Sequence, residues 1–167
     1  MLGHKLYNYN QKYADSKERF LIYRSGRQAG KTMTTAVKTI HWSFFAPIMS
    51  KDAKQKKEGV VIIAAPTQNQ ASIMFDRIRT LVSNSDFLKQ YIVRSTQTEL
   101  WLQWLNKGGI TKIYVRATGE TGVTLRGYSP HVIIADECAF IKRSILVAFL
   151  PSGMATQAKV WLTSTPF

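Results

Sequence analysis

Apolar stretches alternate along the chain with segments in which apolar residues recur about every 3.6 positions. The apolar stretches predict β-strands at residues 20–24, 60–65, 132–135 and 159–163. The stretch at 60–65 is apolar throughout, which is typical of a strand buried on both faces of a parallel sheet. Helices are predicted at residues 30–46, 68–82 and 141–150. This alternation predicts a three-layer α/β domain with a mainly parallel central sheet flanked by helices.

Turn and breaker residues mark where these elements begin and end. Pro47 is expected to end the first long helix or to follow its end closely, and Thr67 suits the N-cap of the second. Residues 91–105 contain alternating apolar and polar positions, and a turn at 106–109 leads into a strand at 110–117. We therefore expect a β-hairpin in this part of the chain.

A glycine-containing loop joins the first strand to the first long helix. It reads Ser25-Gly26-Arg27-Gln28-Ala29-Gly30-Lys31-Thr32. Backbone N–H groups of such a loop converge on phosphate oxygens at the start of a helix. Lys31 is expected to reach the β- and γ-phosphates, and the Thr32 hydroxyl to bind Mg²⁺. Ser25 stands where the usual first glycine would be, and Arg27 is placed near the γ-phosphate unless it points to solvent in an accidental match.

Two acids, Asp136 and Glu137, follow the buried strand at 132–135. In an ATPase with a phosphate-binding loop, Asp136 would hold Mg²⁺ through a water, opposite Thr32. Glu137 would orient or deprotonate the attacking water. Taken alone, the acids fit an ordinary strand end that meets solvent equally well. Together with the loop they predict an ATP-hydrolysing P-loop NTPase of the ASCE type, with ATP and Mg²⁺ as cofactors.

Composition limits the class of protein and its partners. The 167 residues are 45% hydrophobic, so we expect one globular domain over residues 1–167. Lys and Arg number 23 against 10 Asp and Glu, a formal net charge of +13 that favours a nucleic-acid partner. A basic surface that complements an acidic neighbour, or that has no specific partner, is the alternative. No apolar run approaches the ~20 residues that span a bilayer, so no membrane partner is expected.

Two further features bear on partners and location. The lysine-rich segment at 50–58 is either a solvated loop or a contact to a nucleic-acid backbone. Cys138 is the single cysteine, which excludes an internal disulfide and makes an intracellular location the expectation.

From about residue 11 onward, the chain resembles the ATPase domain of the large terminase subunit of tailed bacteriophages and related viruses. Four segments carry the resemblance: the loop Ser25 to Thr32 with its internal arginine; Ala64-Ala65-Pro66-Thr67 with Gln70; Leu125-Arg126-Gly127-Tyr128-Ser129-Pro130 leading into Asp136-Glu137; and Leu162-Thr163-Ser164-Thr165-Pro166. Their order and spacing match over nearly the whole chain.

The resemblance implies an ATP-driven motor that moves double-stranded DNA into a procapsid. Such motors are rings, usually pentamers, that sit on the portal protein in the host cytoplasm and work with a small terminase subunit. Lys31, Thr32, Asp136 and Glu137 would keep the roles given above.

The resemblance also implies roles for residues outside these two motifs. Arg27 would sense the γ-phosphate, and Gln11 would contact adenine. The segment Thr163, Ser164 and Thr165 would couple hydrolysis to movement. An arginine acting on the nucleotide of the neighbouring subunit is expected among Arg77, Arg79 and Arg126.

Full-length members of this family continue into an RNase H-like nuclease, which is not expected within residues 1–167. The chain is therefore expected to be a truncated ATPase domain. A helicase-like ATPase acting on nucleic acid is one alternative function. A nucleotide-binding assembly module without turnover is the other.

Overall fold

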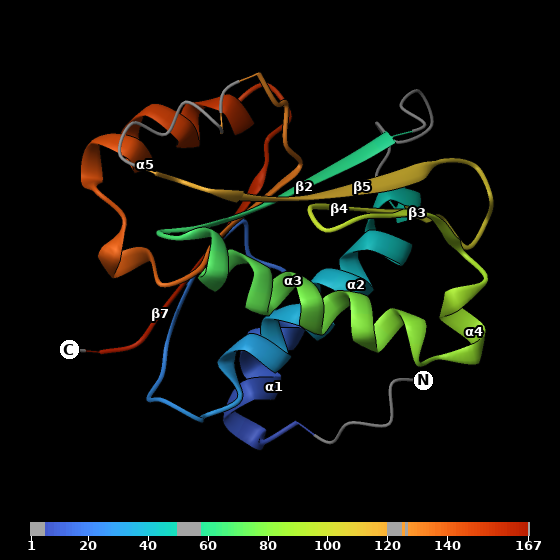
Figure 1. Ribbon diagram of the computed structural model, residues 1–167, viewed down its shortest axis with the longest axis horizontal. Coiled ribbons are helices and arrows are strands. Elements are labelled where there is room, and N and C mark those ends of the chain that lie inside the picture. Colours follow the sequence, from blue (N-terminus) through green and yellow to red (C-terminus); the bar gives the residue numbers. More distant parts are fainter. Residues whose placement is uncertain (1–5, 50–57, 120–124, 126, 167) are drawn as a thin grey trace.

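The protein is a three-layer α/β domain around one mixed sheet (Figure 1). The computed structural model describes residues 6–49, 58–119, 125 and 127–166. In chain order the elements are α1 (Asn8–Asp15), β1 (Phe20–Arg24), α2 (Lys31–Met49), β2 (Glu58–Ala65), α3 (Gln68–Ser83), α4 (Asp86–Lys89), β3 (Ile92–Ser95), β4 (Glu99–Gln103), β5 (Ile110–Ala117), β6 (Val132–Ala135), η3 (Cys138–Phe140), α5 (Arg143–Phe149), η4 (Leu150–Gly153) and β7 (Lys159–Ser164).

The sheet has the strand order β1-β7-β6-β2-β5-β4-β3. The first five strands in this order run parallel, and β4 and β3 are antiparallel to their neighbours. The predicted mainly parallel sheet is therefore confirmed. The hairpin expected around residues 106–109 is confirmed as the β4–β5 pair, and β3 extends it by one more antiparallel strand.

Two hydrophobic cores lie on opposite faces of the sheet because side chains alternate along β2. Val61 and Ile63 pack in the core shared with α2 and α3, whereas Ile62 and Ala64 pack in the core shared with α5. Figure 1 shows the same layering, with α1, α2 and α3 on one side of the sheet and α5 on the other. Both faces of β2 are thus buried, as its continuous apolar run predicts.

The prediction that Pro47 ends the first long helix was wrong, since α2 continues to Met49. A proline has no N–H, so the carbonyl four residues earlier, on Ser43, loses its helical donor. The hydroxyl of Thr111 on β5 donates to that carbonyl instead, at 2.8 Å. The same hydroxyl accepts a bond from the indole N–H of Trp104. This tertiary bond compensates the backbone, so the helix persists past the proline.

Other element boundaries follow the sequence more closely. Thr67 caps α3 as predicted, its hydroxyl accepting from the backbone N–H of Gln70 at 3.3 Å. The helix expected at 141–150 is shorter, because α5 ends at Phe149 and a 3₁₀ turn, η4, carries the chain past Pro151. The lysines expected to be solvated or to touch nucleic acid at 50–57 lie outside the described residues.

The sheet order brings three functional segments together. β1, β7 and β6 are parallel neighbours, so their carboxyl ends lie at one edge of the sheet. The loop 25–30 leaves β1, the pair Asp136 and Glu137 leaves β6, and Thr165 follows β7. Open α/β sheets bind ligands at this end. Within the described residues, no helix is long and apolar enough to cross a membrane.

Candidate functional site

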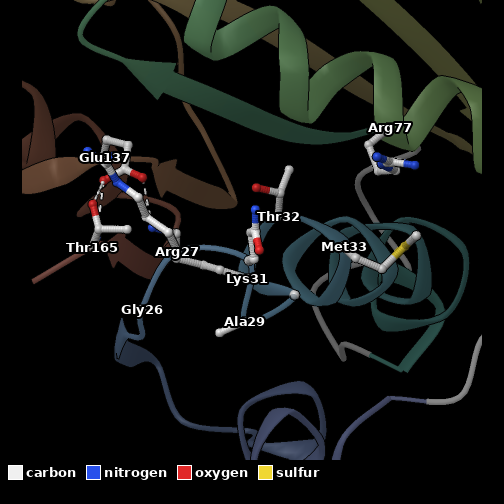
Figure 2. A pocket seen from close by; sticks show the side chains of 11 residues that line it. Gly26, Arg27, Ala29, Lys31, Thr32, Met33, Arg77, Glu137 and Thr165 are labelled. Atoms are coloured by element: carbon white, nitrogen blue, oxygen red, sulfur yellow. Dashed lines mark hydrogen bonds and ion pairs between the residues drawn. The ribbon is translucent and has the colours of Figure 1, made fainter.

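A cavity of about 360 Å³ lies at the carboxyl ends of these strands (Figure 2). Residues 26–33 form its floor, Glu137 and Thr165 line one part of its wall, and Arg77 of α3 also faces it. The loop residues expected to bind nucleotide are thus gathered around one space, apart from Ser25. The Ser25 hydroxyl is buried and has no hydrogen-bond partner within the described structure, while its backbone N–H donates to the Ser164 carbonyl at 3.3 Å.

The loop adopts a backbone shape that depends on left-handed residues. Gln28 has φ 60° and Gly30 has φ 79°. At Gly30 a Cβ would also lie 2.9 Å from the side-chain nitrogen of Asn10, so both backbone angle and space require glycine there. The Gly30 carbonyl then accepts from the N–H and the hydroxyl of Thr34, each at 2.9 Å, which starts α2.

Lys31 stands at the first position of α2 and reaches the acidic strand end. Its ammonium donates to Oε1 of Glu137 at 2.8 Å, and the two side chains are 7% and 20% exposed. Residues 106 positions apart therefore form a partly buried ion pair inside the cavity. Their expected roles, phosphate binding and water activation, stay predictions.

The second carboxylate oxygen of Glu137 is held by the end of β7. It accepts from the Thr165 hydroxyl at 2.9 Å and from the Thr165 N–H at 3.1 Å. The Ser164 hydroxyl lies 3.4 Å from the same oxygen. Burial would raise the pKa of Glu137, but the hydrogen bonds from Lys31 and Thr165 outweigh it and hold that pKa below its usual range. Glu137 is thus ionised at neutral pH and held in one orientation.

Asp136 occupies a drier position than its neighbour. It is buried, and its Oδ1 accepts from the hydroxyl of Thr163 at 2.5 Å. Burial raises the pKa of Asp136 despite that hydrogen bond and the nearby Lys31. A buried carboxylate that is costly to ionise is suited to lie beside a cation.

The oxygens of Thr32 and Asp136 fit the hard-ligand chemistry of Mg²⁺, which commonly takes one or two protein oxygens and completes its shell with phosphates and water. Thr32 lines the cavity, whereas Asp136 is not among its wall residues, an arrangement suited to a water-mediated contact. Within the described part of the chain, no group of three or more Asp, Glu, His or Cys side chains is placed to hold a metal ion by itself.

The other predicted site residues fall in different places. Arg27 is exposed and lines the cavity, as does Arg77. Arg79 instead donates to Asp76 at 2.9 Å and to the Thr96 carbonyl at 3.1 Å, outside the cavity wall. Gln11 is exposed on α1 and does not line the cavity. Arg126 lies outside the described residues.

Two polar residues near the site were not predicted from the sequence. Asn10 of α1 donates to the Ala29 carbonyl inside the loop, and Lys38 of α2 is buried against α1. Neither has a motif around it. The sole hint is that Lys38 interrupts the hydrophobic side of a helix in which several other polar residues are also buried, among them Thr35 and Thr39.

Comparison with known proteins agrees with this geometry. The family model described as "Terminase large subunit, T4likevirus-type, N-terminal" matches residues 22–167. The chain belongs to the large terminase family. A search of curated protein sequences finds no match to the chain.

Solved structures share the terminase fold at low sequence identity. The ATPase domain of the Thermus phage P74-26 large terminase is 19% identical with a TM-score of 0.75, over 99% of this chain and 67% of that one. The HK97 bacteriophage large terminase is 14% identical with a TM-score of 0.73, over 97% of this chain and 33% of that one. A large terminase from a thermophilic bacteriophage, solved in complex with ADP, is 15% identical with a TM-score of 0.73, over 94% of this chain and 38% of that one. The three-layer P-loop fold predicted from the sequence is therefore confirmed, and the chain spans about a third of the longer terminases.

Proposed function

We propose that this terminase chain is an ATP-hydrolysing motor domain that drives double-stranded DNA into a procapsid. One observation carries the proposal. Lys31 at the end of the phosphate-binding loop, Glu137 after β6 and Thr165 after β7 meet through hydrogen bonds of 2.8–3.1 Å in a single cavity. Family membership and the ADP complex of a structural relative support ATP as the ligand.

The residues divide the reaction among them. Loop N–H groups and Lys31 bind the β- and γ-phosphates, and Arg27 faces the same space from within the loop. Glu137 accepts a proton from a water whose oxygen bonds to the γ-phosphorus, while the bond from that phosphorus to the bridging oxygen breaks and ADP leaves. Thr32 and Asp136 would hold Mg²⁺, which neutralises phosphate charge when bound.

The contacts of Glu137 suggest how hydrolysis is coupled to movement. Thr165 and Ser164 bond the carboxylate that is proposed to activate water, and Thr163 bonds Asp136. A change of charge or position at either acid therefore alters the hydrogen bonds at the end of β7. This supports the proposal that Thr163, Ser164 and Thr165 form the coupling segment.

The partners follow from charge and family. A formal net charge of +13 favours contacts to DNA phosphates, without sequence-specific contacts to the bases. The affinity for DNA is therefore expected to fall steeply as the salt concentration rises. A homomeric ring on the portal protein, acting with a small terminase subunit in the infected cell, is proposed from the family. Gln11 is proposed to contact adenine from α1, whose neighbouring residue Asn10 touches the loop.

Nucleotide binding and hydrolysis of the purified chain test the proposal. Calorimetric titration with ATP and Mg²⁺ is expected to show binding that Lys31→Ala abolishes, and steady-state phosphate release is expected to be lost in Glu137→Gln. Wild-type affinity in Lys31→Ala would overturn the assignment of the loop. Binding without any wild-type turnover, also with DNA present, would favour the assembly module. Separation of duplex strands by the wild type would favour the helicase-like alternative.

A further inference from the structure

The side chain of Asn10 joins helix α1 to the phosphate-binding loop. Its amide nitrogen donates to the Ala29 carbonyl at 3.1 Å, and its oxygen accepts from the hydroxyl of Tyr23 on β1. Asn10 is 1% exposed, so both ends of the carboxamide need partners inside the protein. A flipped amide would set its oxygen against the Ala29 carbonyl, so these two partners fix its orientation.

This bond sets the direction of the Ala29–Gly30 peptide. A trans peptide is planar, so a carbonyl of Ala29 that points at α1 turns the Gly30 N–H away from α1. Figure 2 shows the Lys31 and Thr32 side chains at the start of α2, next to this peptide. The hydroxyl of Tyr9 lies 3.4 Å from the same carbonyl and reinforces the orientation. A reversed peptide would direct a carbonyl oxygen, which repels phosphate, into the loop's binding surface.

Helix α1 is itself fixed to α2 by a buried lysine. The ammonium of Lys38 donates to the carbonyls of Tyr13, Ala14 and Ser16 at 3.0, 2.8 and 2.7 Å. These are carbonyls at the C-terminal end of α1, which have no donor within the helix. The same ammonium lies 5.4 Å from the ring centre of Tyr13 and 5.0 Å from that of Trp161. Lys38 is 7% exposed, so these groups replace its water.

These contacts connect the loop, α1 and α2 to one another. Lys31 and Lys38 belong to one helix, Lys38 holds α1, and Asn10 of α1 holds the Ala29–Gly30 peptide. We infer that Asn10 is a positioning residue that holds the phosphate-binding loop in the conformation that binds nucleotide. Lys38 holds α1 against α2, so that Asn10 stays within reach of the loop. The inference rests on the proposed nucleotide function of the loop.

Asn10→Asp is the sharpest test because it keeps the oxygen that accepts from Tyr23 and loses the donor to Ala29. The matched control is Asn8→Asp, the same change on the same helix at an exposed side chain. In titrations with ATP and Mg²⁺, Asn10→Asp is expected to raise the Kd about tenfold at unchanged stoichiometry, as the loss of one buried hydrogen bond predicts. The control is expected to keep the wild-type Kd.

A purely structural role would give a different pattern. Irreversibly misfolded protein lowers the stoichiometry and leaves the Kd of the folded fraction unchanged, whereas reversible unfolding raises the Kd only by the reciprocal of the folded fraction, which circular dichroism measures. If Asn10→Asp does not fold, Tyr23→Phe takes its place, since it removes the hydroxyl that orients Asn10 and retains the ring stacked on Tyr13. It is expected to raise the Kd about threefold. Folded variants with the wild-type Kd would overturn the inference.

Amide hydrogen exchange without nucleotide separates this inference from the proposed function. Asn10→Asp and Lys38→Met are expected to speed exchange about tenfold at the amide of Thr34, which donates to the loop carbonyl of Gly30, and to leave β2 unchanged. Unchanged exchange at this amide in both variants would overturn the positioning role even if ATP binds. Faster exchange at this amide in a protein whose wild type binds no ATP would refute the proposed function and leave the loop–helix coupling standing.

Discussion

The ammonium of Lys31 and the carboxylate of Glu137 form an ion pair at 2.8 Å, which joins the phosphate-binding loop to the acidic end of β6. Each residue is proposed to act on ATP through the atoms that make this contact. Phosphate binding by Lys31 therefore competes with Glu137, and release of Glu137 from Lys31 frees a carboxylate oxygen for water. Under this proposal the pair would make nucleotide binding and base activation mutually dependent.

Glu137→Gln is expected to bind ATP more tightly while losing turnover. The substitution removes a negative charge beside the phosphates and weakens the competing contact to Lys31. A gain of about 1 kcal/mol, the difference between a charged and a neutral hydrogen bond, corresponds to a roughly fivefold lower Kd. Calorimetric titration with ATP and Mg²⁺ measures this directly. Weaker binding by Glu137→Gln would show that the carboxylate assists nucleotide binding instead of competing with it.

The same acid gives a pH dependence of stability with a defined sign. Hydrogen bonds from Lys31 and Thr165 outweigh burial and lower the pKa of Glu137 in the folded state from about 4.5. The folded state thus binds fewer protons there than the unfolded state, so the contribution is present above pH 4.5 and is lost as pH falls through the lower, folded pKa. Glu137→Gln is expected to be less stable than wild type at neutral pH, with a gap that narrows in acid.

Urea unfolding of both proteins from neutral pH down to about pH 3 checks this gap. Burial raises the pKa of Asp136 and the charge of Glu137 adds to that rise, so this acid titrates with the opposite sign and offsets part of the gap. A gap that widens on acidification would contradict the role of the ion pair.

The parts of this structure that sequence predicts well are those set by local pattern. The continuous apolar run at 60–65 became β2, buried on both faces, and the loop from Ser25 to Thr32 joins β1 to α2 as its residues require. The end of α2 was mispredicted because the bond from Thr111 to Ser43 comes from a strand 68 residues away. The sequence shows that Pro47 cannot donate a helical hydrogen bond, but it does not show that a distant hydroxyl replaces that donor.

The roles of several polar residues at the site could not be predicted from the sequence. Asn10 and Lys38 hold the site together through bonds to backbone carbonyls that are distant in the sequence. The residues next to them in the chain do not indicate these bonds. Arg77 and Arg79 read alike in sequence. Residues two positions apart on a helix differ by about 200° around its axis, so the side chains of Arg77 and Arg79 must point in different directions. Only the packing of α3 decides which of them faces the cavity.

Two threonines at the end of β7 are expected to respond differently to the same substitution. Thr163→Val removes the hydroxyl that bonds buried Asp136 and should destabilise the fold by about 1–3 kcal/mol. Thr165→Val removes a hydroxyl from Glu137 but leaves the backbone N–H bond at 3.1 Å, so stability should change little. Its expected effect is a lower kcat for ATP, with DNA stimulation reduced, because Glu137 is less firmly oriented. Thermal unfolding and phosphate release measure the two effects, and equal destabilisation by both variants would refute this division.

Arg77 lines the cavity of its own chain, so we expect it to act on its own nucleotide. Arg77→Ala should raise the Kd for ATP about tenfold, the loss of roughly one charged hydrogen bond. Arg79→Ala is the matched control on the same helix. Its guanidinium is paired with Asp76 on the surface, a contact worth at most about 1 kcal/mol of stability, and it should leave the Kd unchanged.

Mixing two impaired variants, at an ATP concentration below the raised Kd of Arg77→Ala, decides between action within a chain and action on a neighbour. One variant is Arg77→Ala, which retains Lys31, and the other is Lys31→Ala, which retains Arg77. If Arg77 serves its own cavity, each chain in the mixture carries one impaired site, and phosphate release does not exceed the sum of the two variants measured alone. If Arg77 served the adjacent subunit of a ring, the Arg77→Ala chains would receive the missing guanidinium from Lys31→Ala neighbours and phosphate release would recover. Recovery in the mixture would therefore reverse the assignment and make Arg77 a residue of the subunit interface.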